Sequence, residues 1–488
     1  MSAAMSAALI SMVTPLLVGL LLLLYPTRYA ALLVLLGSTV SLVSAGSAMV
    51  AVMEPGTATM ALGGWEAPLA IRFRVSTLTG LLLTFTALVH LLVALYAGRV
   101  QSRSREGVPA RLAAQRDYWP LSCFLHAALA ALWMSADLFS LYVALELVSL
   151  AAVALVALAG PKGWRPALHY LLLSLAGSLF YLLGVALLYG RYGVLDIPLL
   201  ATVTDSDRLT RMALVTMTLG LMLKGALWPL HLWLPAAHAN APTPVSALLS
   251  GVVVKGPLFV LWTLWAELAP SDLYAGAGVS LAVAGVLALL GGGWQSLRAP
   301  QLKVVVAYST VAQLGYALIA LGLLLAWQLP RLHLALWLFV LAHGLAKVSM
   351  FLAAGEMQDT LGSRRVSALK GATQTMPVAM FAFAVAGGSL IGLPPSGGFL
   401  AKWELLQPMV QQPERWPWLA AILLATLLSA AYVFRVVVIA FGSVAAEHAP
   451  VHVDRRAQWF ALLPALLVWG MALVSTPLIF WLTQEAVP

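Results

Sequence analysis

The sequence contains very little charge and almost no cysteine. Only 9% of its 488 residues are Asp, Glu, Lys or Arg, whereas 62% are hydrophobic. A water-soluble domain carries far more charge than this, so the composition excludes a soluble globular protein. The single cysteine, Cys123, excludes an internal disulfide and a cysteine-ligated iron–sulfur cluster held by this chain alone. A nucleotide-binding GxxxxGK[ST] loop is also missing, so any energy that this chain uses must come from a gradient or a partner.

Long apolar runs occupy most of the chain instead. A helix needs about 20 apolar residues to cross a hydrocarbon core of roughly 30 Å. We therefore predict an all-α polytopic membrane protein with about fourteen transmembrane helices, the first of them retained as a membrane span. The predicted spans are residues 7–26, 29–53, 76–97, 118–135, 138–160, 166–190, 211–230, 243–266, 275–293, 303–326, 333–354, 376–402 (interrupted), 417–441 and 457–483.

Lysine and arginine are unevenly shared between the loops of this topology. More than twice as many fall in the loops after odd-numbered helices as in the loops after even-numbered ones. Because cytoplasmic loops collect positive charge, this bias predicts that both termini lie outside. The net charge of +9 then reflects topology and not nucleic-acid binding. The basic loop 98–116 fits a stop signal best, although docking of an acidic partner or anionic lipid is the alternative.

The stretch 224–256, KGALWPLHLWLPAAHANAPTPVSALLSGVVVKG, is apolar yet has a lysine near each end. A lysine at the centre of a membrane helix costs roughly 2.5–3.5 kcal/mol on insertion scales, so Lys224 and Lys255 are candidate functional residues. Its prolines free backbone groups that must be satisfied by protein or by a water-filled cavity. The stretch therefore predicts a broken helix. The prolines are Pro229, Pro235, Pro242 and Pro244.

Glu146 is the acid that the predicted spans place near mid-membrane, about 13 Å deeper than Asp137. Lys224 lies about 20 Å into its own helix, at a similar depth. At an assumed separation of about 7 Å and an effective dielectric constant near 20, their attraction is roughly 2.4 kcal/mol. Separating or neutralising this pair would switch Lys224 between holding and releasing a proton. The first three predicted spans, up to residue 97, contain one obvious ionisable group, His90, and we interpret these helices as scaffold.

The second half repeats these features. His343 and Lys347 are four residues apart and share a helix face, and Lys402 follows a break in SLIGLPPSGGFLAKW. Two Gly- and Pro-interrupted spans with buried lysines indicate a transport site built from paired repeats. We predict N-terminal scaffold helices and a basic loop at 1–117, five-helix repeats at 118–266 and 267–441, and a last helix at 442–488.

Five segments carry a resemblance to a known family: LYVALEL, LKGALWPLHLWLPAAHANAPTPVSALLSGVVVKG, LKVVVAYSTVAQLGYALIALG, HGLAKVSMFLAAGE and GLPPSGGFLAKW. Together they resemble the antiporter-like membrane subunits shared by respiratory complex I, membrane-bound hydrogenases and Mrp-type cation/proton antiporters. The resemblance implies two inverted five-helix repeats and proton translocation along a midplane row. By motif, the row consists of Glu146, Lys224, Lys255, His343, Lys347 and Lys402. Some family members carry a histidine where this chain has Phe339, so water would have to fill that gap.

The resemblance also implies the setting of the protein. It implies that the partners are other membrane subunits and that the chain lies in the lipid bilayer of a bacterial or archaeal cytoplasmic (inner) membrane. It implies protons as the cargo and leaves open whether Na⁺ moves elsewhere in the complex. It also implies that this chain binds neither a cofactor nor a metal. The chain would be the non-redox pumping subunit of an NADH–quinone oxidoreductase or hydrogenase, or part of a cation/proton antiporter. Sodium suits the row less well, because it prefers several oxygen ligands and the row has four lysines to one acid.

Two other classes of function stay open at this point. One is a stand-alone carrier of an anionic solute, bound by the positive ends of the broken helices. The other is a haem-bearing electron carrier, because bis-histidine ligation is conceivable for the helical histidines His90, His126, His169 and His343. The remaining histidines are expected at the membrane interfaces, mostly as polar surface, with His231 as a candidate for lining an entry. They are His231, His238, His333, His448 and His452.

Overall fold

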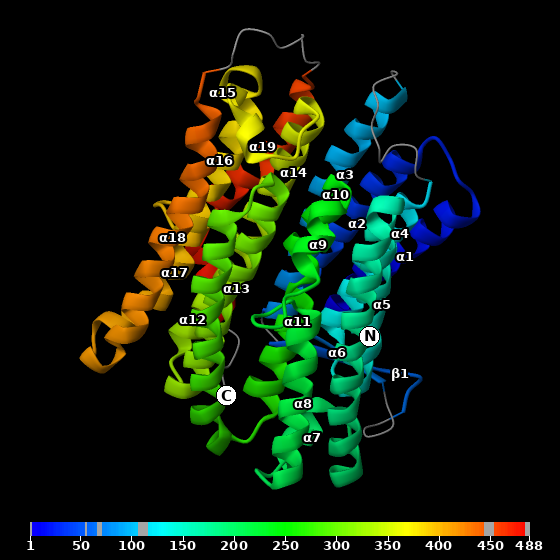
Figure 1. The fold of residues 1–488 in the computed structure, drawn as a ribbon. Helices are drawn as coiled ribbons and strands as arrows, with labels where there is room; N and C mark the ends of the chain where they lie inside the picture. Colours follow the sequence, from blue (N-terminus) through cyan, green and yellow to red (C-terminus); the bar gives the residue numbers. More distant parts are fainter. Residues whose placement is uncertain (1, 54–55, 66–70, 106–115, 444–452, 484–488) are drawn as a thin grey trace.

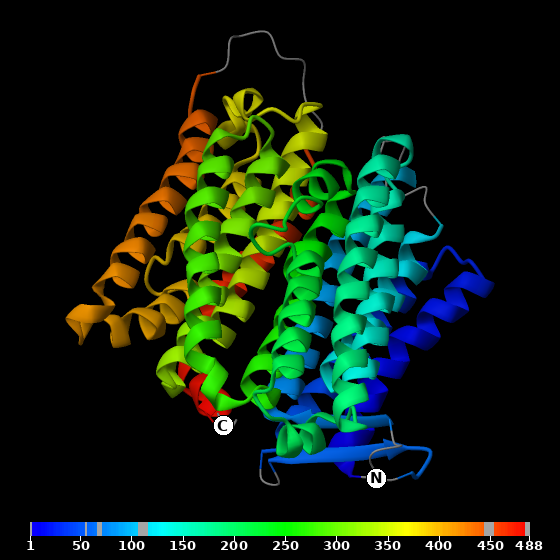
Figure 2. The ribbon, with the colours of Figure 1, turned by 60° about the horizontal axis from the view of Figure 1, so that its bottom comes forward.

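The computed structural model describes residues 2–53, 56–65, 71–105, 116–443 and 453–483. Long helices run side by side through one bundle, and a two-stranded sheet covers one end of it (Figures 1 and 2). We call this end the hairpin end and the opposite one the far end. Helix α1 begins and α20 ends toward the hairpin end, so the two ends of the described chain lie on the same side of the bundle (Figure 2).

The described helices and strands fall into three consecutive parts of the chain. The first part forms α1 (Ala3–Leu24), α2 (Ala30–Ala51), β1 (Thr57–Leu62), β2 (Ile71–Ser76) and α3 (Thr77–Arg105). The next part forms α4 (Tyr118–Met134), α5 (Leu138–Ala157), α6 (Pro161–Tyr192), α7 (Ile197–Val203), α8 (Arg208–Lys224), α9 (Leu234–Asn240), α10 (Thr243–Leu248), η1 (Leu249–Val253), α11 (Lys255–Trp262) and η2 (Thr263–Leu268). The last part forms η3 (Ser271–Leu273), α12 (Tyr274–Arg298), α13 (Leu302–Trp327), α14 (Pro330–Leu361), η4 (Val366–Leu369), α15 (Ala372–Thr375), α16 (Pro377–Ile391), α17 (Gly397–Val410), η5 (Pro413–Arg415), α18 (Trp416–Ala440), α19 (Arg455–Gly470) and α20 (Ser475–Thr483).

Many of these helices are long and apolar enough to cross a membrane. Among the described residues ten meet both conditions, or eleven if α19 and α20, bent by 70° at their junction, count as one span. The shorter apolar helices α4 and α16 fall below the length limit. The expectation of an all-α membrane protein is therefore confirmed, while the count of fourteen helices stays a prediction.

The segment between α2 and α3 differs from the sequence expectation. The predicted spans 29–53 and 76–97 leave this segment as a connection, but in the structure β1 and β2 form an antiparallel hairpin in which Thr57 pairs with Ser76 and Leu62 with Ile71. Alternate residues of a strand share a face. In β2 this places two arginines on one side, where they form ion pairs with acids of other segments. Arg72 lies 3.2 Å from Asp196, and Arg74 lies 2.6 Å from Glu267. These contacts hold the hairpin against the bundle.

Glycines set the closest approaches between helices. Lipid tails are as apolar as leucine, so membrane helices associate through tight packing of small residues. A Cβ atom on Gly220 of α8 would lie 2.3 Å from the carbonyl oxygen of Gly177 on α6. A Cβ atom on Gly315 of α13 would lie 2.4 Å from the carbonyl oxygen of Gly285 on α12. Backbone therefore meets backbone at both places, and no side chain fits between them.

The first broken helix lies where the sequence predicts it, although it breaks earlier than the predicted span 211–230. Helix α8 ends at Lys224, and Ala226 adopts a left-handed φ of 50°. The indole N–H of Trp233 donates to the carbonyl of Leu223 at 2.9 Å. The same carbonyl accepts from the backbone N–H of Ala226 at 3.3 Å, so backbone and side chain together satisfy it at the break, as burial in a membrane requires.

The second broken helix is formed by α16 and α17. Helix α16 ends at Ile391, Gly392 has a φ of 93°, and α17 begins at Gly397. The side chain of Ser396 caps α17 by accepting a hydrogen bond from the N–H of Phe399 at 3.2 Å. This agrees with the interruption predicted inside 376–402.

Candidate functional site

The first cluster of buried charge joins α5, α6 and α8. The ammonium of Lys224 donates to Glu146 at 2.7 Å, to Ser149 at 3.1 Å and to Ser174 at 3.2 Å. Lys224 is 3% exposed, and the hydroxyl of Ser178 also donates to Glu146. The pair predicted from the sequence therefore exists, but it is a direct contact and the assumed 7 Å was wrong. With an effective dielectric constant near 20, 2.7 Å corresponds to an attraction of about 6 kcal/mol, an upper bound for a partly wetted pair.

The glycine contact between α6 and α8 is what brings this pair together. Gly220 lies one turn before Lys224, and Gly177 lies nearly one turn after Ser174. Because these glycines bring the two backbones into contact, Lys224 can reach Ser174 on α6 and Glu146 on the neighbouring α5. The helix ends at Lys224, so its ammonium sits directly at the break of the broken helix that the sequence predicts.

Lys255 follows a distortion in the next span. The π-helical segment η1 (Leu249–Val253) directly precedes it, and the ammonium donates to the carbonyl of Ser250. A π-helical turn leaves backbone carbonyls imperfectly paired, and such turns occur frequently at functional sites. Lys255 is 1% exposed. The contact of Gly225 with Pro257, at 3.2 Å from a Cβ placed on the glycine, connects the end of α8 to the start of α11.

Helix α14 carries the next two groups of the row. The ammonium of Lys347 donates to the carbonyl of Val306 at 3.1 Å and to the hydroxyl of Ser309, both on α13. The ring of His343 stacks on Phe339 with centroids 5.2 Å apart, and neither of its nitrogens has a hydrogen-bond partner among the described residues. Lys255 lies within electrostatic range of both Lys347 and His343. The structure therefore brings these three predicted residues together.

Lys402 lies at the second broken helix, and among the residues that the structure describes no carboxylate forms an ion pair with it. It donates to the carbonyls of Leu390 at 3.0 Å and Ile391 at 2.9 Å, which are the last of α16, and to Thr426 at 3.4 Å. Its ammonium lies 4.3 Å from the ring centroid of Tyr316. The carbonyls at a helix C-terminus are unpaired and carry partial negative charge. A helix end and an aromatic ring thus replace here the acid that pairs with Lys224.

A small cavity separates His343 from Lys402. It has a volume of about 10 Å³, and its lining includes Phe339, Gln313 and Ser389 as well as the two basic residues. A cavity of this volume is about the smallest that can hold one water molecule, and the side chains of Gln313, Ser389, His343 and Lys402 offer it polar partners. The place where Phe339 interrupts the row of basic residues therefore has room for water.

The structure adds buried polar groups that the sequence reasoning missed. His238 is fully buried, stacks on Phe351 with centroids 4.4 Å apart, and lies within electrostatic range of Lys255, Lys303 and Lys347. The sequence predicts an interfacial position for His238 because prolines surround it. The spacing of prolines, however, does not determine how deeply a residue is buried in the bundle.

Two further groups of this kind are Lys303 and Glu356. Lys303 is 7% exposed and donates to the carbonyl of Ala241 at 3.2 Å and to Thr243 at 3.0 Å. Glu356 is buried and accepts from the hydroxyl of Tyr96 at 3.2 Å.

The expectation that the remaining histidines are polar surface was wrong for two of them, because His238 and His333 are 0% and 2% exposed. His231, the candidate for lining an entry, is 6% exposed. His333 accepts a hydrogen bond from the indole of Trp337 at 3.0 Å. The other two, His448 and His452, lie outside the described residues.

Fold and site together define a largely helical integral membrane protein with buried cationic groups at two helix breaks. The chain belongs to the family described as NADH:quinone oxidoreductase/Mrp antiporter, TM, which it matches over residues 135–429. The resemblance seen in the sequence is thereby confirmed.

Two relatives show how far the similarity extends. The chain is 36% identical over 387 residues to the NADH-quinone oxidoreductase subunit N of Desulforudis audaxviator, which covers 77% of this chain and 74% of that protein. It is 26% identical over 408 residues to a subunit of the Na(+)/H(+) antiporter of Bacillus subtilis, which covers 83% of this chain and 80% of the relative.

Solved structures share the fold. A subunit of the Mrp complex from Dietzia sp. superposes with a TM-score of 0.88 at 22% identity, covering 99% of this chain and 97% of that one. A chain of respiratory complex I from Thermus thermophilus superposes with a TM-score of 0.72 at 24% identity, covering 98% of this chain and 100% of that one. The chain therefore has the fold of membrane subunits found in multisubunit complexes.

Proposed function

We propose that this chain is the proton-translocating, antiporter-like subunit of a larger membrane complex. The observation that carries the proposal is a series of buried basic groups that begins at one broken helix and ends at the other. Lys224 and Lys402 lie at the two breaks. Lys255, Lys347 and His343 lie within electrostatic range of one another. Ionisable groups inside a membrane protein mark proton relays because their burial is otherwise unfavourable.

The contact between Lys224 and Glu146 can act as the switch of this relay. While the contact is closed, the carboxylate stabilises the ammonium and the proton stays on Lys224. When the carboxylate is neutralised or moves away, the buried ammonium loses up to several kcal/mol of attraction and releases its proton. The acceptor we propose is Lys255, whose helix contacts the end of α8.

The proton then passes along His343 and Lys347 toward Lys402. The cavity beside Phe339 provides room for about one water between His343 and Lys402. Lys402 is held by carbonyls and not by a carboxylate, so the second half of the row lacks an acid that could trap the proton. We propose release at this end.

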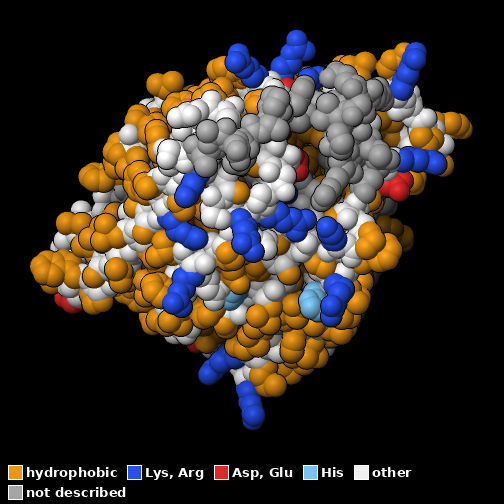
Figure 3. Space-filling view, turned by 45° about the horizontal axis from the view of Figure 1, so that its top comes forward, with side chains coloured by type: hydrophobic (Ala, Val, Ile, Leu, Met, Phe, Trp, Pro, Cys, Tyr) orange, Lys and Arg blue, Asp and Glu red, His pale blue; other side chains and the backbone are white. Residues whose placement is uncertain are grey.

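The division of the chain and its orientation are part of this proposal. We assign the five-helix repeats to 118–266 and 267–441, each containing one broken helix. Figure 3 shows many Lys and Arg side chains on the far end of the bundle. Because positive charge collects on the cytoplasmic side, this distribution supports a far end that faces the cytoplasm of a bacterial or archaeal cell, with both termini outside the inner membrane.

The partners we propose are other membrane subunits. One relative is named for an NADH-quinone oxidoreductase and another for a Na(+)/H(+) antiporter, so both redox-driven and gradient-driven complexes use chains of this family. The neighbours that co-purify with the chain would decide between these two settings.

The test is proton translocation by the reconstituted complex. We expect Glu146→Gln and Lys224→Ala each to lower the initial rate of proton uptake, followed with a pH-sensitive dye, by more than tenfold. The matched control is Lys162→Ala, which removes an exposed lysine at the start of α6 and should leave the rate unchanged. Full activity in both site variants would refute the proposal.

A further inference from the structure

A groove on the surface lies between α8 and α12 near the hairpin end. It has a volume of about 440 Å³, and Trp265 of η2 and Ala277 of α12 are among the residues that line it. A second hollow shares Arg211 and Val215 with the groove and extends over Arg208. The two hollows form one continuous depression along α8, which we call the α8–α12 groove.

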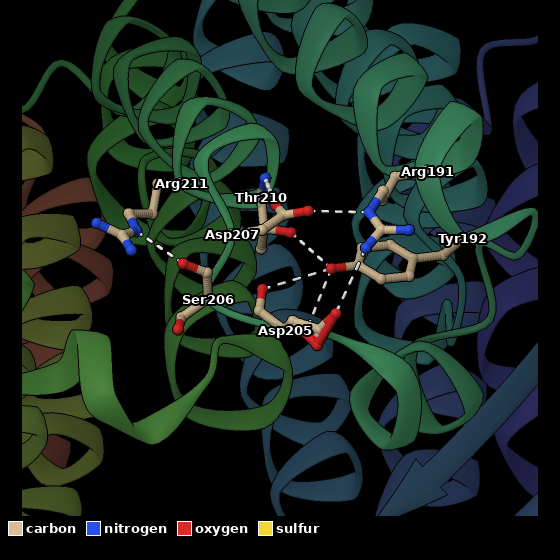
Figure 4. Close-up of polar contacts among 7 residues, drawn as sticks. All are labelled: Arg191, Tyr192, Asp205, Ser206, Asp207, Thr210 and Arg211. Atoms are coloured by element: carbon tan, nitrogen blue, oxygen red, sulfur yellow. Dashed lines mark hydrogen bonds and ion pairs between the residues drawn. The ribbon is translucent and has the colours of Figure 1, made fainter.

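The charged end of this groove is held by the network in Figure 4. Arg191 lies 2.9 Å from Asp207 and 3.5 Å from Asp205, so both acids are already paired. Arg211 uses its Nε to donate to the carbonyl of Ser206 at 2.8 Å. Its terminal nitrogens point away from the acids (Figure 4). In the described part of the chain neither Arg208 nor Arg211 forms an ion pair with a carboxylate, and one acid, Asp272, lines the groove.

Below the arginines the groove is apolar. Met212, Val215 and Leu219 continue the same face of α8 and are 53%, 53% and 40% exposed. The distance from Arg211 to Leu219 is about 12 Å along the helix axis. The floor is closed by Trp265, whose indole donates to Thr218 at 2.9 Å and thus leaves no free donor there. Two guanidinium groups that form no ion pair within the described residues thus lie at the end of an apolar groove. This arrangement fits a lipid whose anionic headgroup lies at the arginines and whose acyl chain lies along the apolar side chains.

We propose that the α8–α12 groove binds a phospholipid of the bilayer. The phosphate lies against Arg208 and Arg211, because guanidinium groups bind phosphate oxygens with two parallel hydrogen bonds. One acyl chain follows Val215 and Leu219 along the groove. The two arginines outnumber Asp272, so an anionic lipid such as phosphatidylglycerol is preferred. The inference needs only the membrane location of the chain and is independent of proton translocation.

The experiment uses the full-length chain in its purified complex, reconstituted with a photoactivatable phosphatidylglycerol that carries a diazirine on its acyl chain. After irradiation, labelled peptides are mapped by mass spectrometry. We expect label on 212–219 of α8 and on 276–281 of α12. One basic residue contributes about a fivefold preference for an anionic lipid, so Arg208→Gln combined with Arg211→Gln should reduce this labelling roughly 25-fold. A diacylglycerol with the same acyl chain but no phosphate should label the wild type only weakly.

Two controls keep the result interpretable. Arg331→Gln removes an exposed arginine at the start of α14 and should leave the labelling unchanged. Ala277→Phe fills the groove while both arginines remain, and it should also reduce labelling. Undiminished labelling in the double arginine variant would overturn the proposal, because the lipid would then be held without its phosphate. Absence of label together with crosslinks to a neighbouring subunit would overturn it too, since a protein helix would occupy the groove.

Discussion

The contact between Gly177 and Gly220 offers the sharpest test of how the fold builds the site. In Gly220→Ala the new Cβ would lie 2.3 Å from the carbonyl oxygen of Gly177 and 2.8 Å from the backbone nitrogen of Tyr181. Ordinary contact begins near 3.4 Å, so α8 has to move from α6 by about 1.1 Å. The obstructing atoms are backbone and cannot turn aside. Overpacking of this kind costs about 1–3 kcal/mol, which exceeds the roughly 1 kcal/mol that alanine contributes to helix propensity.

The same displacement acts on the charged pair. The bond from Lys224 to Ser174 would lengthen from 3.2 Å to about 4.3 Å and be lost. If the contact with Glu146 lengthened equally, from 2.7 Å to about 3.8 Å, the attraction would fall from about 6 to about 4.4 kcal/mol at an effective dielectric constant of 20. The difference corresponds to a factor of roughly 20 in the equilibrium that holds the proton on Lys224.

We therefore expect Gly220→Ala to lower both the apparent melting temperature and the rate of proton uptake of the reconstituted complex. Gly190→Ala is the matched control, because a Cβ on this glycine of α6 meets nothing within 4 Å. It should retain activity and should not lower stability. If Gly220→Ala melts and translocates protons like the wild type, the backbone contact does not position Lys224.

Three further predictions concern other parts of the molecule. His238→Leu should lower proton uptake at least tenfold in the dye assay, because His238 lies within electrostatic range of three buried lysines; uptake at the wild-type rate would show that proton transfer does not need His238. Arg74→Gln should weaken the attachment of the hairpin by about 1 kcal/mol, seen as faster proteolysis at residues 57–76, and unchanged cleavage would mean that the pair with Glu267 is not needed. The backbone N–H of Thr210 and the guanidinium of Arg191 lower the pKa of Asp207 from 3.8 to about 2. The stability that this carboxylate contributes is therefore present above about pH 4 and is lost as the pH falls through 2. Asp207→Asn should remove this part of the acid sensitivity, measured as melting temperature against pH, and identical profiles would contradict the assignment.

The corrections at the hairpin and at the buried histidines have a common origin. The alternation in 71–76 is short and lies in a segment that also contains glycine and proline, so the sequence alone does not distinguish it from a connection between the predicted spans. His238 lies among prolines that resemble an interfacial segment. In both cases the missing information is the identity of the partner, and those partners, Glu267 and Phe351, are more than 100 residues away in the chain.

The sequence by itself determined the class of the protein, its two helix breaks and the lysines beside them. These are local properties, because the length of an apolar run, a proline inside it and a charge within it depend on neighbouring residues only. Only the tertiary structure decided that Glu146 touches Lys224 directly, that helix-end carbonyls hold Lys402, and that a water-sized cavity adjoins Phe339. Each of these depends on how closely helices approach, which is set by backbone contacts such as Gly177 with Gly220, and hydrophobicity along the chain does not encode that distance.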